Sequence, residues 1–317
     1  MAPLLSVKNG RRVRMTDVII IGGGTAGLTA AIYLQRSALQ CAVLEAEEFG
    51  GRIFPTLAIE NYPAMPGASG FEYSENLRAQ AETLGAELTA QTARSLVRDG
   101  DLWQITTLDD MLFTSRAVIY AAGEKQRMLE VPGEEEFLGR GVATCAACDG
   151  ALFRDKIVAI IGGGDKALDD ALTLSKLCTT VHLIHRREEF RAVGNTVIQV
   201  KGTPNITLHL NRIITSINGT SRVENVTLRC MENDEEETLA VSGVFVAIGS
   251  IPQTALCAGL VELDKQGYII AGEDCATSEP GLFVAGDARR KPFRQLVTAA
   301  ADGATAAKAA ADYIMRS

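Results

Sequence analysis

The sequence predicts an α/β protein with two Rossmann-like dinucleotide-binding domains of the three-layer ββα type. The first observation is an apolar strand, residues 17–21, that runs into Gly22-Gly-Gly-Thr-Ala-Gly27 and then into an alanine- and leucine-rich helical pattern. The second is the same order of strand, glycine-rich turn and helix about 140 residues later, at Gly162-Gly-Gly-Asp-Lys-Ala167. The third is the length of 317 residues with 47% hydrophobic side chains, which suffices for two cores.

Composition and charge exclude several classes of function. The net charge of −8 gives no general attraction to nucleic acid or to anionic membranes. No apolar run approaches the roughly 20 residues that span a bilayer. Five of the seven cysteines are scattered, and one close pair favours redox or metal chemistry in a reducing compartment. We therefore expect a soluble, cytoplasmic protein whose mildly basic residues 1–14 form a flexible extension.

The first glycine motif is G-x-G-x-x-G. Gly22 makes the tight turn, Gly24 lets a pyrophosphate approach the backbone, and Gly27 lets helix and strand pack closely. The N-terminus of the helix then faces the phosphates. Glu45 follows the next strand, where an acidic side chain can accept hydrogen bonds from a ribose. This context predicts dinucleotide binding, and the alternative is a turn used only for packing.

The second glycine motif is G-x-G-x-x-A, and its following strand ends differently. The acidic residue is replaced by His185-Arg186-Arg187, with Arg191 four residues further on. Guanidinium groups bind a 2′-phosphate through paired, charge-assisted hydrogen bonds, whereas a carboxylate would repel it. The second site is therefore predicted to take NADPH. The alternative is a solvated basic turn balanced by Glu188 and Glu189.

Two further strands end in motifs suited to a bound cofactor. The strand at residues 117–120 ends in Ala121-Ala-Gly123, and the strand that starts at Gly281 ends in Gly286-Asp287 ahead of a last alanine-rich helix. A flavin is expected to lie near both corners. In the alternative interpretation Asp287 is only a turn or cap residue.

The close cysteine pair lies in Thr144-Cys-Ala-Ala-Cys-Asp149. Two thiols at this spacing can close a small disulfide, and amide dipoles at a helix start can stabilise a thiolate. Asp149 is a candidate proton donor or, alternatively, a helix cap. A zinc site with His182 and His185 is disfavoured, because residues three apart on a strand point to opposite faces. We predict no metal.

Five motifs together resemble the low-molecular-weight thioredoxin reductases, flavoproteins with two dinucleotide-binding domains. They are Gly22-Gly-Gly-Thr-Ala-Gly-Leu-Thr-Ala-Ala31, Leu129-Glu-Val-Pro-Gly-Glu134, Cys145-Ala-Ala-Cys-Asp149, His185-Arg-Arg-Glu-Glu-Phe-Arg-Ala192 and Gly286-Asp-Ala-Arg289 with Arg294-Gln295. The likeness extends from Met15 over nearly the whole chain.

The resemblance implies a discontinuous FAD-binding domain, residues 15–123 and 252–317, with an NADPH-binding domain inserted at 124–251. It also implies hinges near residues 123–125 and 249–252, and a homodimer. Electrons would pass from NADPH to FAD, to the disulfide of Cys145 and Cys148, and on to a small thioredoxin-like protein disulfide. Cys148 would face the flavin, and Cys145 would attack the partner.

The predicted cofactor residues follow from the motifs and the resemblance. The FAD set is Gly22, Gly24, Thr25, Ala26, Gly27, Glu45, Gly51, Arg52, Asn61, Ala122, Gly123, Gly286, Asp287, Arg294, Gln295 and Leu296. The NADPH set is Gly162, Gly164, Asp165, Lys166, Ala167, His185, Arg186, Arg187 and Arg191.

Some positions depart from the family pattern. Lys166 stands where a small hydroxyl residue is common, Asp169 and Asp170 replace two glutamates, and Arg52 replaces a glutamine. Lys166 would either help hold a pyrophosphate or obstruct it, and Arg52 would either tune a flavin or point to solvent. The rival functions are a ferredoxin- or oxygen-dependent dithiol flavoenzyme, the reductase half of a peroxiredoxin system, and a non-catalytic flavin-binding sensor.

Overall fold

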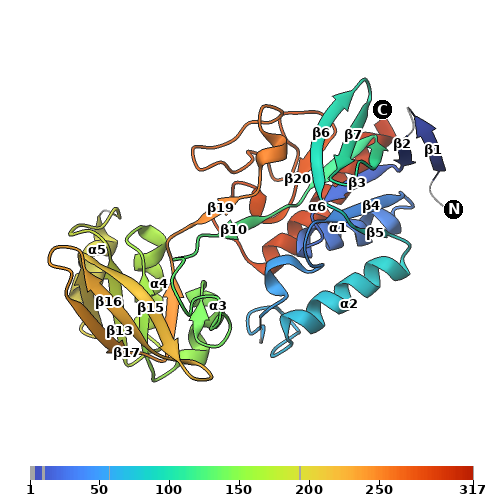
Figure 1. The fold of residues 1–317 in the computed structure, drawn as a ribbon. Helices are drawn as coiled ribbons and strands as arrows, with labels where there is room; N and C mark the ends of the chain where they lie inside the picture. Colours follow the sequence, from blue (N-terminus) through green and yellow to red (C-terminus); the bar gives the residue numbers. More distant parts are fainter. Residues whose placement is uncertain (1–3, 9–10, 57, 193, 317) are drawn as a thin grey trace. The chain divides into compact units, whose positions relative to one another are not determined.

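The computed structural model describes residues 4–8, 11–56, 58–192 and 194–316. The chain divides into two compact units (Figure 1). The first, unit 1, comprises residues 1–125 and 251–317, and the second, unit 2, comprises residues 126–250. The chain crosses between the units after residues 125 and 250, whereas the domain bounds inferred from the resemblance are 123 and 251. The chain passes between the units through two strands that pair with each other, β10 (Glu124–Gln126) and β19 (Ser250–Pro252).

Unit 1 is built on a five-stranded parallel sheet in the order β20-β9-β3-β4-β5. These strands are β3 (Val18–Ile21), β4 (Cys41–Glu45), β5 (Glu87–Ala90), β9 (Ala117–Tyr120) and β20 (Leu282–Val284). One face is covered by α1 (Thr25–Arg36), α2 (Gly70–Thr83) and α6 (Leu296–Arg316). Gly303 of α6 approaches so closely that an added methyl would overlap the Ala26 carbonyl. Small residues therefore let α1 and α6 pack directly together.

The opposite face of this sheet packs against a second sheet, in the order β1-β2-β8-β7-β6. Its strands are β1 (Leu4–Lys8), β2 (Arg11–Met15), β6 (Ala93–Asp99), β7 (Leu102–Thr107) and β8 (Leu112–Ser115). Along β3, Val18 and Ile20 face the helices while Ile19 and Ile21 face Trp103 and its neighbours. This period-2 alternation produces the ββα layering that the sequence predicts, and the fold class is confirmed.

The N-terminal segment differs from the flexible extension expected at residues 1–14. β1 pairs antiparallel with β2, and β2 pairs parallel with β8. Val13 is buried, and the Arg14 guanidinium forms an ion pair with Glu87 and lies over the Phe113 ring. These contacts lie far apart in sequence, so local composition gave no sign of them. Residues 1–3 and 9–10 of the expected extension lie outside the described residues.

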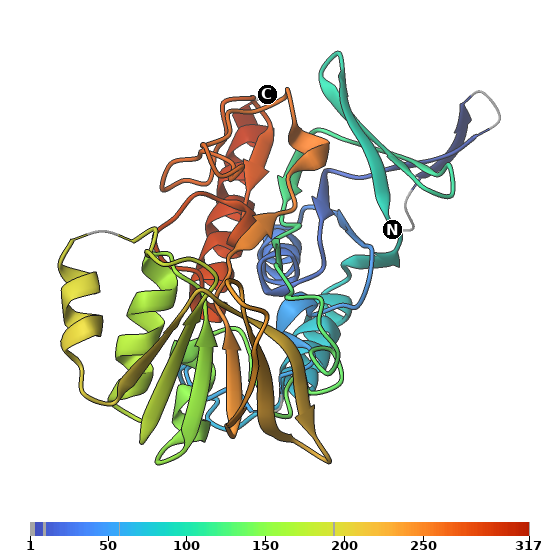
Figure 2. The same ribbon diagram turned by 60° about the vertical axis from the view of Figure 1, so that its left-hand side comes forward.

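Unit 2 has a parallel sheet in the order β11-β18-β12-β13-β14. Its strands are β11 (Val142–Ala143), β12 (Ile157–Ile161), β13 (Thr180–His185), β14 (Ile206–Leu210) and β18 (Gly243–Val246). Figure 2 shows α4 (Asp165–Ser175) and α5 (Asn195–Gly202) side by side on one face. The other face meets the antiparallel sheet of β15 (Arg212–Gly219), β16 (Val223–Cys230) and β17 (Glu236–Ala240).

The remaining elements are short. They are α3 (Ala146–Asp149) and the 3₁₀ turns η1 (Gly51–Ile53), η2 (Gly150–Phe153), η3 (Ala255–Cys257) and η4 (Gly286–Ala288). Most of them follow or precede a parallel strand, and η1, α3 and η4 carry residues of the predicted sites. Within the part of the chain that the structure describes, no helix is both long and apolar enough to cross a membrane.

Candidate functional site: two glycine loops and a disulfide

The first glycine loop joins β3 to α1 in unit 1. Gly22 has a φ of +108°, and a methyl group on its Cα would overlap the Ala121 carbonyl, so only glycine fits. A methyl on Gly27 would overlap the Gly22 carbonyl, which brings α1 close to the loop. At Gly24, by contrast, the nearest atom would be 3.8 Å away, and this N-cap supplies no capping side chain. The start of α1 is thus open on the Gly24 side.

Glu45 ends β4 and binds the glycine loop. Its Oε2 accepts a hydrogen bond from the Gly23 N–H at 2.6 Å, and its Oε1 accepts one from the Glu47 N–H at 2.8 Å. Gly50 N–H donates to the Gly23 carbonyl at 2.9 Å from the other side. The carboxylate predicted to bind a ribose therefore also fixes the loop that would carry the phosphates.

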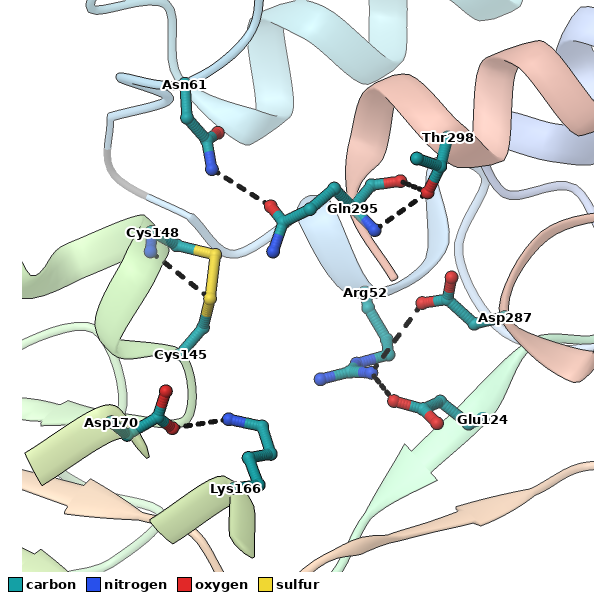
Figure 3. Close-up of a disulfide and its surroundings, with 10 residues drawn as sticks. All are labelled: Arg52, Asn61, Glu124, Cys145, Cys148, Lys166, Asp170, Asp287, Gln295 and Thr298. Carbon is teal, nitrogen blue, oxygen red and sulfur yellow. Dashed lines mark hydrogen bonds and ion pairs between the residues drawn. A yellow bond between two sulfur atoms is a disulfide. The ribbon is translucent and has the colours of Figure 1, made fainter. Parts of the chain in front are cut away.

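Arg52 lies in η1 and belongs to an ionic cluster around the buried Glu124. Its Nη1 donates to Glu124 Oε1 at 2.7 Å and lies 3.9 Å from Asp287 Oδ2 (Figure 3). Glu124 is 8% exposed, and its other oxygen accepts from the Tyr268 hydroxyl at 2.8 Å. Burial is the largest influence on Asp287 and raises the pKa of its carboxyl. The Arg52 guanidinium is thus paired with carboxylates of unit 1, although its side chain is 44% exposed.

Asp287 is the residue of this cluster with unused capacity for a ligand. It lies on η4, directly after β20, as the Gly-Asp motif predicts. Its Oδ1 is buried and has no hydrogen-bond partner within the described residues, and the nearest cation is Lys291 Nζ at 3.8 Å. A buried acceptor left in this state favours a bound group that donates a hydrogen bond to it.

A second ionic group holds the corner at Gly286. Asp302 of α6 accepts from the Gly286 N–H at 3.0 Å, from Arg289 Nη2 at 2.9 Å and from Lys291 Nζ at 2.9 Å. Both Asp302 and Lys291 are almost fully buried. Because α6 supplies the carboxylate, the last helix fixes the backbone at the Gly-Asp corner.

The other predicted FAD-site residues of unit 1 gather at the same strand ends. Asn61 Nδ2 donates to Gln295 Oε1 at 3.0 Å, and Gln295 N–H donates to Thr298 Oγ1 at the start of α6 (Figure 3). The Arg294 guanidinium stacks on the Tyr268 ring, 3.7 Å from its centroid. Leu296 begins α6, and Ala122 and Gly123 follow β9.

The second glycine loop joins β12 to α4 in unit 2. A methyl on Gly162 would overlap the Ala167 side chain and the Ala247 carbonyl, whereas one on Gly164 would find its nearest atom, Arg191 Nη2, at 3.8 Å. Lys166 Nζ lies 2.5 Å from Asp170 Oδ2 one helical turn on (Figure 3). Burial raises the pKa of the Asp170 carboxyl, and Lys166 partly opposes that shift.

The basic residues after β13 do not all face solvent. Arg186, Arg187 and Arg191 are exposed, as a site for a phosphate requires. His185 is only 6% exposed, and its ring stacks on Phe190. His182, on the opposite face, instead contacts His209, Nδ1 to Nε2 at 3.0 Å. His182 and His185 therefore lie on opposite faces of β13. The described residues contain no group of three or more His, Cys, Asp or Glu side chains that could hold a metal ion.

Cys145 and Cys148 form a disulfide with a Cα–Cα distance of 5.3 Å (Figure 3). Cys145 is the N-cap of α3, and the Cys148 N–H points at its sulfur at 3.2 Å. Asp149 ends this short helix, where burial raises the pKa of its carboxyl to about 6. The other five cysteines are free and buried.

Each of the two glycine loops leaves the N-terminus of a helix accessible, as a dinucleotide phosphate requires. Each places a helix N-terminus without a capping side chain beside a glycine, Gly24 or Gly164, where an added methyl would find its nearest atom only at 3.8 Å. Anions bind readily at such helix ends, because N–H groups and the helix dipole point at them. One unit adds a buried carboxylate at Asp287, and the other adds exposed arginines.

Comparison with known proteins decides the family. A family model described as pyridine nucleotide-disulphide oxidoreductase matches residues 16–303. The thioredoxin reductase of Treponema pallidum is 42% identical over 300 residues, which cover 94% of this chain and 97% of that protein. The chain belongs to the thioredoxin reductase family. The resemblance drawn from the five motifs is confirmed.

Two further family members extend this finding. The crystal structure of thioredoxin reductase from Streptococcus pyogenes matches 96% of this chain and 99% of its own, with a TM-score of 0.92 and 35% identity. The bifunctional thioredoxin reductase/thioredoxin of Mycobacterium leprae is 41% identical over 92% of this chain. This thioredoxin reductase family member spans only 64% of that longer protein.

Several residues around the site are not among the predicted site residues, although Arg289 ends one of the five motifs. Glu124, Tyr268, Arg289, Lys291 and Asp302 form the ionic groups around Arg52 and Gly286. Glu124 directly follows the predicted Gly123, so its position was a usable signal. Tyr268 and Asp302 belong to no motif, and only the folded chain brings them to the strand ends.

Proposed function

We propose that this protein is an NADPH-dependent thioredoxin-disulfide reductase that uses FAD. The observation that carries the proposal is the disulfide of Cys145 and Cys148 in the same unit as the Gly162 loop. A redox pair and a glycine loop followed by arginines serve one reaction, in which a nicotinamide nucleotide supplies electrons to a disulfide. Membership of the thioredoxin reductase family supports the same assignment.

We assign FAD to unit 1 and NADPH to unit 2. The Gly22 loop, Glu45 and Asp287 would hold the FAD, and the Gly162 loop with Arg186 and Arg187 would hold the NADPH. When bound, FAD would take a hydride from NADPH and pass two electrons to the disulfide. The paired strands β10 and β19, flanked by Gly123 (φ +66°) and Gly249 (φ +103°), are the hinge segments of this proposal.

The chemistry of the pair conserves atoms and electrons. Two electrons and two protons convert the disulfide to two thiols. The Cys145 thiolate then attacks a sulfur of the partner disulfide and expels the other partner sulfur as a thiolate, which leaves a mixed disulfide. Cys148 attacks the Cys145 sulfur, releases the reduced partner and restores the intramolecular bond.

We assign a proton-transfer role in this cycle to Asp149, which directly follows Cys148 in the sequence. A carboxyl with a pKa of about 6 exchanges protons readily near neutral pH, whereas an ordinary aspartate is fully ionised there. We assign Asp149 as the acid that protonates the Cys148 thiolate after its release from the disulfide. The cause of the raised pKa is burial.

We further propose a small thioredoxin-like protein as the partner, a homodimer as the assembly and the cytoplasm as the location. The names of the relatives support the partner, and one of them carries a thioredoxin in the same chain. The free buried cysteines suit a reducing compartment. Sedimentation of the purified protein tests the dimer.

The test is NADPH-dependent reduction of an oxidised thioredoxin by Cys145→Ser and Cys148→Ser variants. We expect both to lose turnover, while Cys230→Ser, a buried cysteine of the same unit outside the motif, keeps it. Turnover that persists in either motif variant would refute the assigned redox centre. Full turnover with reduced ferredoxin but none with NADPH would refute NADPH as the electron donor and leave the assigned redox centre intact.

A further inference from the structure

His185 is enclosed by the two loops that would hold the donor. Its ring lies so close to Gly163 that a methyl group on that glycine would overlap it. On its other side it stacks on Phe190, with ring centroids 5.5 Å apart and planes at 29°. Its Nε2 lies 3.1 Å from the Glu189 carbonyl oxygen. The side chain thus contacts the glycine loop and the arginine-bearing loop, residues 185–192, at once.

A backbone connection runs beside this contact. The Gly163 carbonyl accepts hydrogen bonds from the Arg191 N–H at 2.7 Å and from the Ala192 N–H at 3.2 Å. The Arg191 guanidinium therefore lies next to Gly164, whose added methyl would be 3.8 Å from Nη2. The register between the two loops is set at Gly163, under the His185 ring.

We propose that His185 is a positioning residue that fixes the arginine-bearing loop on the glycine loop, and that selection of NADPH over NADH depends on it although it does not contact the donor. The inference rests on the proposed function, because it concerns how that donor site is arranged. It differs from the prediction for His185, which counted it among the residues that bind the nucleotide.

The state of the ring is consistent with this role. At 6% exposure the imidazole presents almost no surface to a ligand. Burial lowers the pKa of His185, and the nearby charges of Arg187, Arg191 and Arg186 lower it further, against an opposing contribution from the Glu189 carbonyl. A lowered pKa disfavours the protonated ring, which is the form that pairs with a phosphate.

The effect on selectivity for NADPH over NADH follows because the two loops bind different parts of the nucleotide. The pyrophosphate, common to both nucleotides, needs only the glycine loop, whereas the 2′-phosphate also needs the arginines in register with it. Loss of the His185 ring should therefore weaken binding of NADP⁺, which carries the 2′-phosphate, more than binding of NAD⁺. A binding site assembled in advance has a higher affinity than one that must be ordered by its ligand.

The experiment is calorimetric titration of the oxidised holoprotein with NADP⁺ and with NAD⁺. His185→Ala removes the ring, and His185→Phe keeps a ring of similar shape without its nitrogens. We expect His185→Ala to lower the affinity for NADP⁺ about tenfold and to change the affinity for NAD⁺ little. The affinity of His185→Phe for NADP⁺ should stay within about threefold of the wild type. Arg187→Ala serves as the comparison for a contacting residue.

The possible outcomes separate the two claims. If wild-type protein binds neither nucleotide, the proposed donor fails. If it binds NADP⁺ selectively but His185→Phe loses as much affinity as His185→Ala, packing of the ring between the two loops does not determine NADP⁺ binding and the positioning role is wrong. An unchanged ratio of the two affinities in His185→Ala also overturns it.

Gly163→Ala provides an independent variant should His185→Ala fold poorly. The φ of Gly163 lies outside the left-handed region, so the added methyl acts through its overlap with the His185 ring. We expect the same loss of NADP⁺ selectivity, with an unchanged flavin spectrum. Wild-type selectivity in Gly163→Ala would contradict the proposal.

Discussion

The Arg52 guanidinium donates to the buried Glu124 carboxylate at 2.7 Å, where the chain leaves the first sheet of unit 1 for the linker strand β10. Glu124 also accepts from Tyr268, and Arg294 lies 3.8 Å from it. A carboxylate that is 8% exposed is tolerated only when it is paired in this way. Arg52, a departure from the family pattern, thus stabilises the first residue of the linker strand β10.

Replacement of Arg52 by alanine should lower the free energy of unfolding by about 1–2 kcal/mol, less than the loss of a fully buried partner, because Tyr268 and Arg294 remain. Chemical denaturation of the holoprotein measures this. Arg94→Ala is the matched control, since Arg94 pairs with Asp110 at an exposed site where such pairs contribute little. Equal effects of the two substitutions would contradict the buried role of the Arg52 pair.

Asp302→Asn should reduce both stability and retention of FAD. The substitution leaves Arg289 and Lys291 without their charged partner and weakens the anchor of Gly286, so we expect a loss of about 3 kcal/mol. Flavin fluorescence in the filtrate of a diluted sample reports release. Asp312→Asn, on the same helix but paired with Lys308 at the surface, should leave retention unchanged. Tight flavin binding in Asp302→Asn would show that the corner does not need this carboxylate.

Asp149→Asn should stabilise the protein at high pH and not at low pH. The pKa of Asp149 in the folded chain, about 6, exceeds the ordinary value of 3.8, so the folded state holds the proton more tightly than the unfolded state. The aspartate therefore opposes folding above pH 6, by at most ~3 kcal/mol, and ceases to do so as pH falls toward 4. Melting temperatures of both proteins from pH 4 to 8 test this. A constant difference across that range is the contrary result.

Lys166→Thr should leave NADP⁺ affinity within about threefold of the wild type. The lysine replaces a small hydroxyl residue common in the family, but its ammonium lies 2.5 Å from Asp170 and so points along α4. It is thereby kept from obstructing the glycine loop. Calorimetry of the oxidised holoprotein measures the affinity. A gain of tenfold or more in the threonine variant would identify Lys166 as an obstruction.

The sequence predicts this fold well wherever the signal is local. Strand, glycine turn and helix follow one another within about 20 residues at Gly22 and again at Gly162, so the order of residue types alone locates both loops. The cysteine pair is likewise local, with a sequence separation of three. Each of these features depends on neighbours along the chain.

Features that depend on distant neighbours could not be predicted. Glu124 meets Tyr268 144 residues away, and Arg52 meets Glu124 72 residues away. The pairing of β2 with β8 has the same origin, and it places strands where an extension is expected. His185 is the first residue of a family motif, yet its burial depends on how closely Gly163 approaches its ring. The spacing of residues in the sequence does not show this approach.

We propose that NADPH reduces the disulfide of Cys145 and Cys148 through a bound flavin. Anaerobic titration of the purified holoprotein with NADPH, followed by flavin absorbance, tests this proposal. A flavin and a disulfide each take two electrons, so the wild type should consume about two equivalents of NADPH per flavin. The double variant with Cys145→Ser and Cys148→Ser should consume about one. A flavin band that NADPH does not bleach, or equal consumption by the two proteins, would contradict the claim.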